Sequence, residues 1–154
     1  MLQRNTKRLA YKWAALLMVA AFLFITGCAV VSPEHKRFTQ ITTPQSGKSV
    51  VYFYRPFNIL GGSFFPAIYD NDKKVLTGLG LRTYWRYEMD PGKHTFKPKI
   101  LLGLYKKGPL TIDNDKPGKV YYVKMVVSVG YIGFQEMSAE QAKVEMLKTF
   151  RMDS

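Results

Sequence analysis

Short strand-like segments separated by turn sequences follow one another from Ser49 to Met137, and this pattern constrains the fold more than any other feature. Residues 50–54 read Val-Val-Tyr-Phe-Tyr, a β-branched and aromatic run that is typical of a strand. Residues 90–93 read Asp-Pro-Gly-Lys, where proline presets φ and glycine accepts the positive φ of a tight turn. About seven to eight strands with turns this frequent predict a mostly β fold, a small antiparallel β-sandwich.

The periodicity changes to that of a helix after the last predicted strand. Residues 138–141 read Ser-Ala-Glu-Gln, a capping box in which the serine oxygen bonds the backbone amide three residues on. Apolar residues then share one face, which predicts a C-terminal helix over about 139–150 that packs on the sheet.

Pro98 interrupts a predicted strand and favours an edge or a bulge there. The predicted strands are 49–54, 65–70, 75–81, 83–89, 94–100, 110–112, 120–129 and 131–137, and the apolar helix face holds Ala139, Ala142, Met146 and Phe150, with Leu147 beside it.

The N-terminal segment carries the features of an export signal. Four basic residues precede an uninterrupted apolar run over 13–26, and Gly27-Cys28 follows it directly. A basic region, an apolar stretch of roughly 7–15 residues and a small-residue cleavage site are typical of secretory signal peptides. The tetrapeptide Ile25-Thr26-Gly27-Cys28 resembles the lipobox of bacterial lipoproteins. That resemblance implies cleavage between Gly27 and Cys28 and attachment of diacylglycerol to Cys28, the single cysteine of the chain.

An uncleaved membrane anchor is the alternative interpretation of this segment. Residues 13–31 form a stretch of 19 apolar or small residues, close to the ~20 that span a bilayer. Both interpretations place the following domain outside the inner membrane. Ala29, rather than aspartate, follows the cysteine, which resembles the sorting signal for the outer membrane facing the periplasm. The chain therefore divides into a signal peptide (1–27), a flexible tether (28–48) and a β-sandwich domain (49–154).

The charge balance limits the classes of partner. The formal net charge is +12, and the chain that follows the signal peptide keeps 19 basic against 11 acidic residues. A basic domain is attracted to polyanions. In a cell envelope these are lipid or lipopolysaccharide phosphates and peptidoglycan carboxylates, whereas export argues against nucleic acid. The alternative is that the lysines simply keep a small exported domain soluble.

No constellation of residues indicates a reaction. The two histidines have no spacing partners for a metal site, and the serines form no nucleophile elbow. His94 follows a turn, where we expect a solvated side chain. The glycines form neither a phosphate loop nor a dinucleotide fingerprint. The sequence predicts no catalytic residue, no metal and no cofactor.

Two segments are candidate binding surfaces. The first is the apolar loop 57–65, which either folds back over one end of the sandwich or forms a contact patch. The second runs over 97–107, where an apolar tip between lysine pairs suits a membrane interface. Its alternative is an ordinary strand pair with a basic edge. The candidate residues are Phe57, Ile59, Leu60 and Phe64 in the first segment, and Lys97, Lys99, Leu102, Tyr105, Lys106 and Lys107 in the second.

Three stretches of the domain together resemble a family of bacterial lipoproteins, the domain-of-unknown-function family numbered 2846. The resemblance implies a small β-sandwich on a lipid tether and supplies no activity. We therefore expect a non-enzymatic, membrane-anchored envelope lipoprotein that acts as a binding module, with another envelope protein as its partner. An anionic-lipid or lipopolysaccharide surface-binding module is the alternative, followed by an envelope hydrolase. The three stretches are Val51-Tyr52-Phe53-Tyr54-Arg55-Pro56, Asp90-Pro91-Gly92-Lys93-His94 and Pro117-Gly118-Lys119-Val120-Tyr121-Tyr122-Val123.

Overall fold

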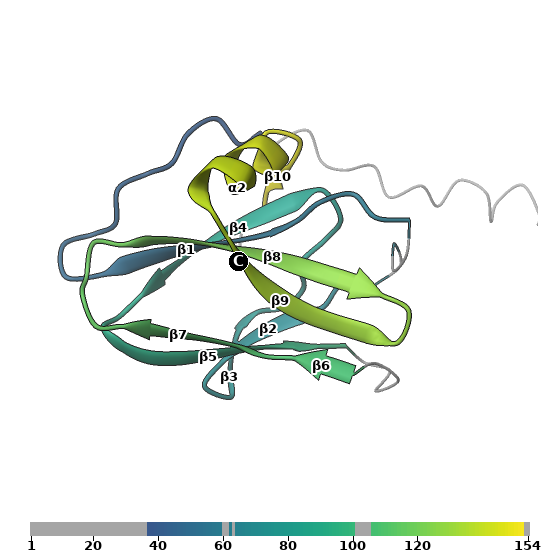
Figure 1. Cartoon of the computed structure of the whole chain (residues 1–154), viewed down its shortest axis with the longest axis horizontal. Helices are drawn as coiled ribbons and strands as arrows, with labels where there is room; N and C mark the ends of the chain where they lie inside the picture. The colour runs from purple at the N-terminus through teal and green to yellow at the C-terminus, as the bar shows by residue number, and fades with distance from the viewer. Residues whose placement is uncertain (1–36, 60–61, 63, 101–105, 153–154) are drawn as a thin grey trace, which may run out of the picture. The chain divides into compact units, whose positions relative to one another are not determined.

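The β-branched and aromatic segments form two sheets that pack face to face, as the sequence predicts (Figure 1). The computed structural model describes residues 37–59, 62, 64–100 and 106–152. Contacts divide the chain into two units, Met1–Pro33 and Glu34–Ser154, and every described residue belongs to the second. The predicted signal peptide, Cys28 and the first part of the tether lie outside the described residues.

The larger sheet has six strands in the order β10-β4-β1-β8-β9-β6. Neighbouring strands are antiparallel for β1–β4 and β8–β9 but parallel for β1–β8, β10–β4 and β6–β9. The predicted mostly β sandwich is confirmed, but the larger sheet is mixed and not antiparallel throughout, because three of its five strand pairings are parallel. Its strands are β1 (Ser49–Arg55), β4 (Thr83–Met89), β6 (Lys106–Gly108), β8 (Val120–Ser128), β9 (Tyr131–Met137) and β10 (Phe150–Arg151).

The smaller sheet has four antiparallel strands in the order β3-β2-β5-β7. The strand that contains Pro98 is internal over Gly92–Phe96, but Pro98 itself pairs only with β2 and lies at a local edge of the sheet. Proline is tolerated because β7 pairs only with Gly92–Phe96, so no partner on that side requires an amide at Pro98. The strands are β2 (Ala67–Asp70), β3 (Lys73–Leu76), β5 (Gly92–Lys99) and β7 (Leu110–Asn114).

All seven residues of β1 are buried, because layers cover both faces of the larger sheet. Val51 and Phe53 point into the core between the sheets, whereas Val50, Tyr52 and Tyr54 belong to a second cluster on the outer face. This alternation follows from the two-residue period of a strand. A continuous apolar run is what such a doubly covered strand requires.

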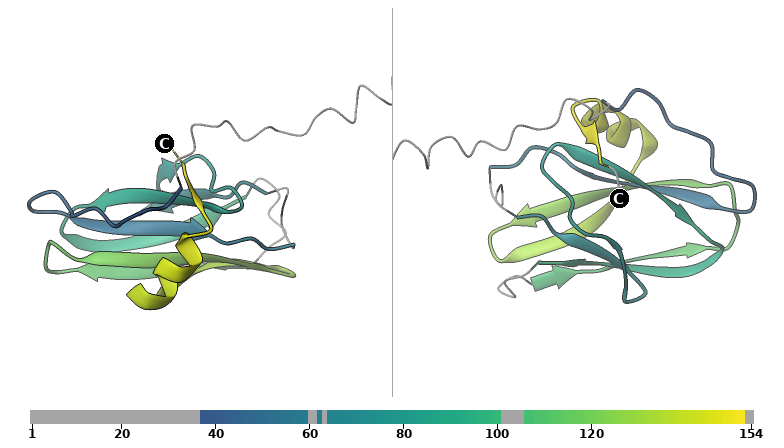
Figure 2. Two further views of the ribbon diagram at one scale, coloured as in Figure 1. Left: turned by 90° about the horizontal axis from the view of Figure 1, so that it is seen from above. Right: turned by 180° about the vertical axis from the view of Figure 1, so that it is seen from behind.

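The outer cluster is covered by α2 (Ala139–Met146), which Figure 2 shows on the side of the larger sheet away from the smaller one. The Ser138 side chain accepts a hydrogen bond from the Gln141 amide, so the predicted N-cap is confirmed. Ala142 and Met146 are fully buried against the sheet.

The predicted C-terminal end of the helix, at residue 150, is wrong. The helix ends at Met146, and the Thr149 hydroxyl bonds the Met146 carbonyl oxygen. Phe150 then joins β4 by donating its amide to the carbonyl oxygen of Arg82. Pairing with the exposed edge of β4 replaces the last helical turn, and Leu147 is left 58 % exposed.

The second half of the predicted tether packs on the domain. Phe38 is only 5 % exposed and donates its amide to the Thr149 carbonyl oxygen. The Thr42 amide bonds the hydroxyl of Tyr52 at 2.9 Å. Residues 37–48 therefore belong to the folded domain, because their apolar side chains complete the outer cluster. In the described ranges no helix is long and apolar enough to cross a membrane, and the apolar run 13–31 lies outside them.

Candidate binding groove

The first described residues of the loop that follows β1 do not fold back over the sandwich. Phe57 is 67 % exposed and Ile59 is 86 % exposed, so the fold-back alternative is wrong for both. The Asn58 side chain donates to the Val127 carbonyl oxygen at 2.9 Å, which fixes the loop against β8. Phe64 is partly buried, and Leu60 lies outside the described residues. A loop that is tied down yet presents large apolar side chains is a candidate contact surface.

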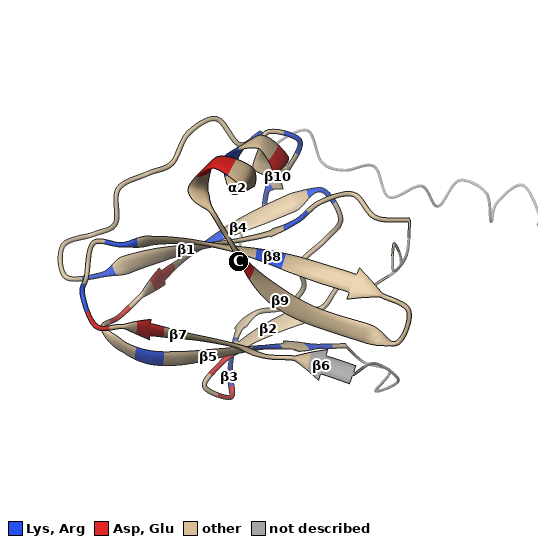
Figure 3. Ribbon diagram, viewed as in Figure 1, with Lys and Arg blue, Asp and Glu red and all other residues tan. Residues whose placement is uncertain are grey.

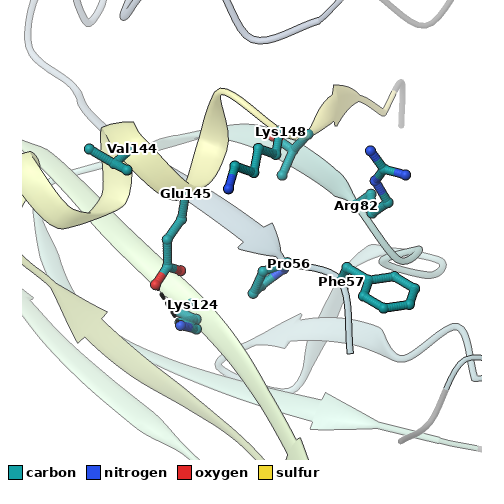
Figure 4. Close-up of a pocket in the computed structure, with 8 residues that line it drawn as sticks. Pro56, Phe57, Arg82, Lys124, Val144, Glu145 and Lys148 are labelled. Carbon is teal, nitrogen blue, oxygen red and sulfur yellow. Dashed lines mark hydrogen bonds and ion pairs between the residues drawn. The ribbon is translucent and has the colours of Figure 1, made fainter. Parts of the chain in front are cut away.

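A groove with a volume of about 600 Å³ lies between this loop and α2 (Figure 4). Pro56, Phe57 and Val144 supply apolar walls, and Val144 is 64 % exposed. A smaller hollow of about 170 Å³ shares Pro56, Phe57 and Lys124 and continues along β8. The full lining of the groove is Pro56, Phe57, Arg82, Lys124, Val144, Glu145, Lys148 and Thr149.

The groove carries three cations and one carboxylate. Lys124 and Glu145 form an ion pair at 2.7 Å, which Figure 4 shows between β8 and α2. Arg82 and Lys148 are exposed, and within the described part of the chain neither has a carboxylate partner. Burial, and then the charge of Glu145, raises the pKa of the Tyr54 hydroxyl beneath them well above its ordinary value. The groove thus combines apolar walls with a positive rim.

The second predicted surface is not assembled as a hairpin. β5 pairs with β2 and β7, whereas β6 crosses to the larger sheet and pairs with β9. Lys97 forms an ion pair with Asp72 at 2.9 Å, and the Lys99 ammonium lies 3.9 Å from the centre of the Tyr69 ring. These two cations are already engaged within the domain. Leu102 and Tyr105, together with the side chains of Lys106 and Lys107, lie outside the described residues.

The sequence predicts a solvated His94 side chain, and this prediction is wrong. Its side chain is 12 % exposed, and its Nδ1 lies 2.6 Å from the Asp70 carboxylate. Its Nε2 lies 3.0 Å from the Asp90 carbonyl oxygen, so both ring nitrogens lie within hydrogen-bond distance of an oxygen. Tyr87 donates its hydroxyl to the same Asp70 oxygen. The cluster joins β2 and β5 of the smaller sheet to β4 of the larger one.

This cluster predicts a loss of stability at high pH. Burial, and then the charge of Asp70, raises the pKa of the Tyr87 hydroxyl above its usual value near 10. Above about pH 10 the unfolded chain releases this proton while the folded chain keeps it, so the free energy of unfolding falls as pH rises. Tyr87→Phe removes at most about 1.4 kcal/mol per pH unit of that slope. Urea unfolding of both chains at increasing pH measures the effect, and parallel curves contradict it.

Sequence reasoning missed the α2 side of the groove. Val144 and Leu147 are apolar, three residues apart and outside the face that Ala142 and Met146 bury. This second apolar stripe is the signal by which the sequence indicates an exposed contact face. Arg82 and Lys124 carry no such signal, because only the fold brings β4 and β8 to the same groove.

Comparison with known proteins identifies no relative. No protein-family model, no curated protein and no solved structure matches the chain. The resemblance to family 2846 therefore stays a prediction. Among the described residues, histidines, cysteines and carboxylates form no group of three suited to a metal ion.

Proposed function

We propose that this protein is a non-enzymatic, lipid-anchored binding module of the bacterial envelope, tethered through Cys28 and facing the periplasm. The observation that carries the binding role is the groove between the loop after β1 and α2. A concave site with apolar walls and a few charged groups is the usual form of a specific binding site. Its exposed phenylalanine and valine supply the contact energy, and its charged rim supplies orientation.

The proposed occupant of the groove is a segment of another envelope protein. The hollow continues along β8 beyond Lys124 towards Val127, so the site is elongated. An elongated hollow suits an extended chain, whose alternate side chains enter apolar pockets. Burying Val144 and Phe57 under such a segment removes water from two side chains that the domain itself leaves exposed.

Photo-crosslinking in intact cells tests this proposal. A photoreactive residue at Lys148, on the groove rim, is expected to give one adduct of defined mass, whereas the same residue at Lys116 gives none. Val144→Asp places a charge on the apolar wall and should weaken the adduct at least about tenfold, since burial of a valine contributes about 1.5–3 kcal/mol.

Val129→Asp is the matched control, because Val129 is 87 % exposed and lies in the β8–β9 turn, outside the groove lining. The adduct should survive this change. Equal adducts at Lys116 and Lys148, or an adduct indifferent to Val144→Asp, contradict the groove as the binding site.

A further inference from the structure

Four exposed apolar side chains gather at one end of the sandwich, which we call the apolar tip: Phe57, Ile59, Phe65 and Val129. The register places them together. β8 runs parallel to β1 and extends past its end, so the turn at Val129 projects beside the loop that follows Arg55. Arg55 donates to the carbonyl oxygens of Phe64 and Leu79, which brings the segment around Phe65 to the same end.

The N-terminal segment enters the domain at this same end. Arg37 bridges to Phe150, Phe150 pairs with Thr83, and Thr83 pairs with Arg55. These four residues therefore form one row across the larger sheet. The row lies at the end of β1 from which the loop of the apolar tip departs.

The length of chain between Cys28 and Arg37 limits how the domain sits on a membrane. Nine residues, fully extended, span at most about 30 Å. A domain of this size is roughly 35 Å across, by the usual relation between radius of gyration and length. A lipid group on Cys28 therefore holds the row that contains Arg37 within reach of the bilayer. The opposite end of β1 lies about 20 Å from this row, at ~3.3 Å per residue, so it faces the lipid only when most of this segment is extended.

The distribution of charged residues agrees with this orientation of the domain. The sequence has no charged residue over 56–66 or over 128–131, whereas charged residues lie in the turns at the opposite end (Figure 3). There, Lys48 pairs with Asp90 and Lys119 with Asp115. Arg82 and Lys148 lie behind the apolar tip, and neither forms an ion pair with a carboxylate within the described part of the chain.

We propose that the apolar tip is the membrane-contacting end of the domain, seated among the headgroups of an anionic bilayer that is attracted by the basic groove rim behind the tip. Apolar side chains backed by basic ones are the composition that binds such an interface. The inference rests on the proposed anchor at Cys28 and extends it. It places the groove beside the membrane surface, so its protein partner is a membrane-embedded or lipid-anchored one.

Fluorescent labelling of the lipidated mature chain, residues 28–154, in phosphatidylglycerol vesicles tests this orientation. Cys28 is the only cysteine, so an acylated chain takes up no thiol label until a cysteine is introduced. Labels on Ile59→Cys and Val129→Cys should be quenched by brominated lipid several-fold more than a label on Lys116→Cys at the opposite end. In phosphatidylcholine vesicles the quenching should fall, because the choline cation cancels the phosphate charge and the headgroup has no net charge.

The matched valines separate this inference from the groove. Val129→Asp should abolish quenching of the label at Ile59→Cys, whereas Val144→Asp should leave it unchanged. The inference is overturned if the labels at 59 and 129 are quenched by brominated lipid no more than the label at 116. It is also overturned if these two labels become inaccessible only when an envelope protein is added. Failure of the anchor gives a different result, because the unaltered chain then takes up label at Cys28.

Discussion

Phe53→Ala is expected to remove a large part of the stability of the domain. Phe53 is fully buried between the sheets, where its ring lies 5.9 Å from Trp85, 4.9 Å from Phe96 and 5.5 Å from Phe134, centre to centre. Truncation leaves a cavity lined by rigid rings, and such changes cost about 3–5 kcal/mol. Domains of this size have about 5–15 kcal/mol in total. Urea unfolding of residues 34–154, followed by circular dichroism, measures the loss.

The chain supplies its own control four residues away. Phe57→Ala removes the same atoms from a side chain that is 67 % exposed, and its effect on unfolding should stay within about 0.5 kcal/mol. A loss of equal size for both phenylalanines contradicts the two-sheet core. A small loss for Phe53→Ala contradicts it as well.

Cys28→Ala is expected to abolish lipid anchoring. The intact mass of the membrane-extracted protein should fit residues 28–154 plus two or three acyl chains, and this species should be absent from the variant. Each buried methylene of an acyl chain contributes about 0.8 kcal/mol, so two chains hold the protein on the membrane essentially without release. Ser32→Ala, which leaves the lipobox intact, should keep the acylated mass.

A different mass would separate the two interpretations of the N-terminal segment. If the unaltered protein has the mass of the full, unmodified chain, residues 13–31 act as an uncleaved membrane span and the lipidation proposal is wrong. The groove is unaffected by that outcome, because it depends on described residues alone, whereas the membrane orientation inferred for the apolar tip rests on the anchor at Cys28.

The local sequence predicted best those segments whose own residue types determine their burial or their turns. The run 50–54 predicted a strand correctly, because β-branched and aromatic residues on both faces require two covering layers. The strand over 83–89 and the helix start at Ala139 were also predicted to the residue. The helix end was not, because pairing of Phe150 with β4 competes with a last helical turn and no local pattern shows that competition.

The sequence by itself determined that this protein is mostly β, with a capped C-terminal helix, since side-chain periodicity shows which faces are buried. Only the tertiary structure decided which strands lie side by side. The parallel pairing of β1 with β8 joins segments about 70 residues apart and brings Val129 to the end that holds Ile59, whereas packing of α2 on β8 brings Glu145 to Lys124. In the smaller sheet, the pairing of β2 with β5 buries His94 against Asp70. Periodicity is a local property, whereas pairing minimises the free energy of the whole sheet, so the groove and the tip arise from the fold.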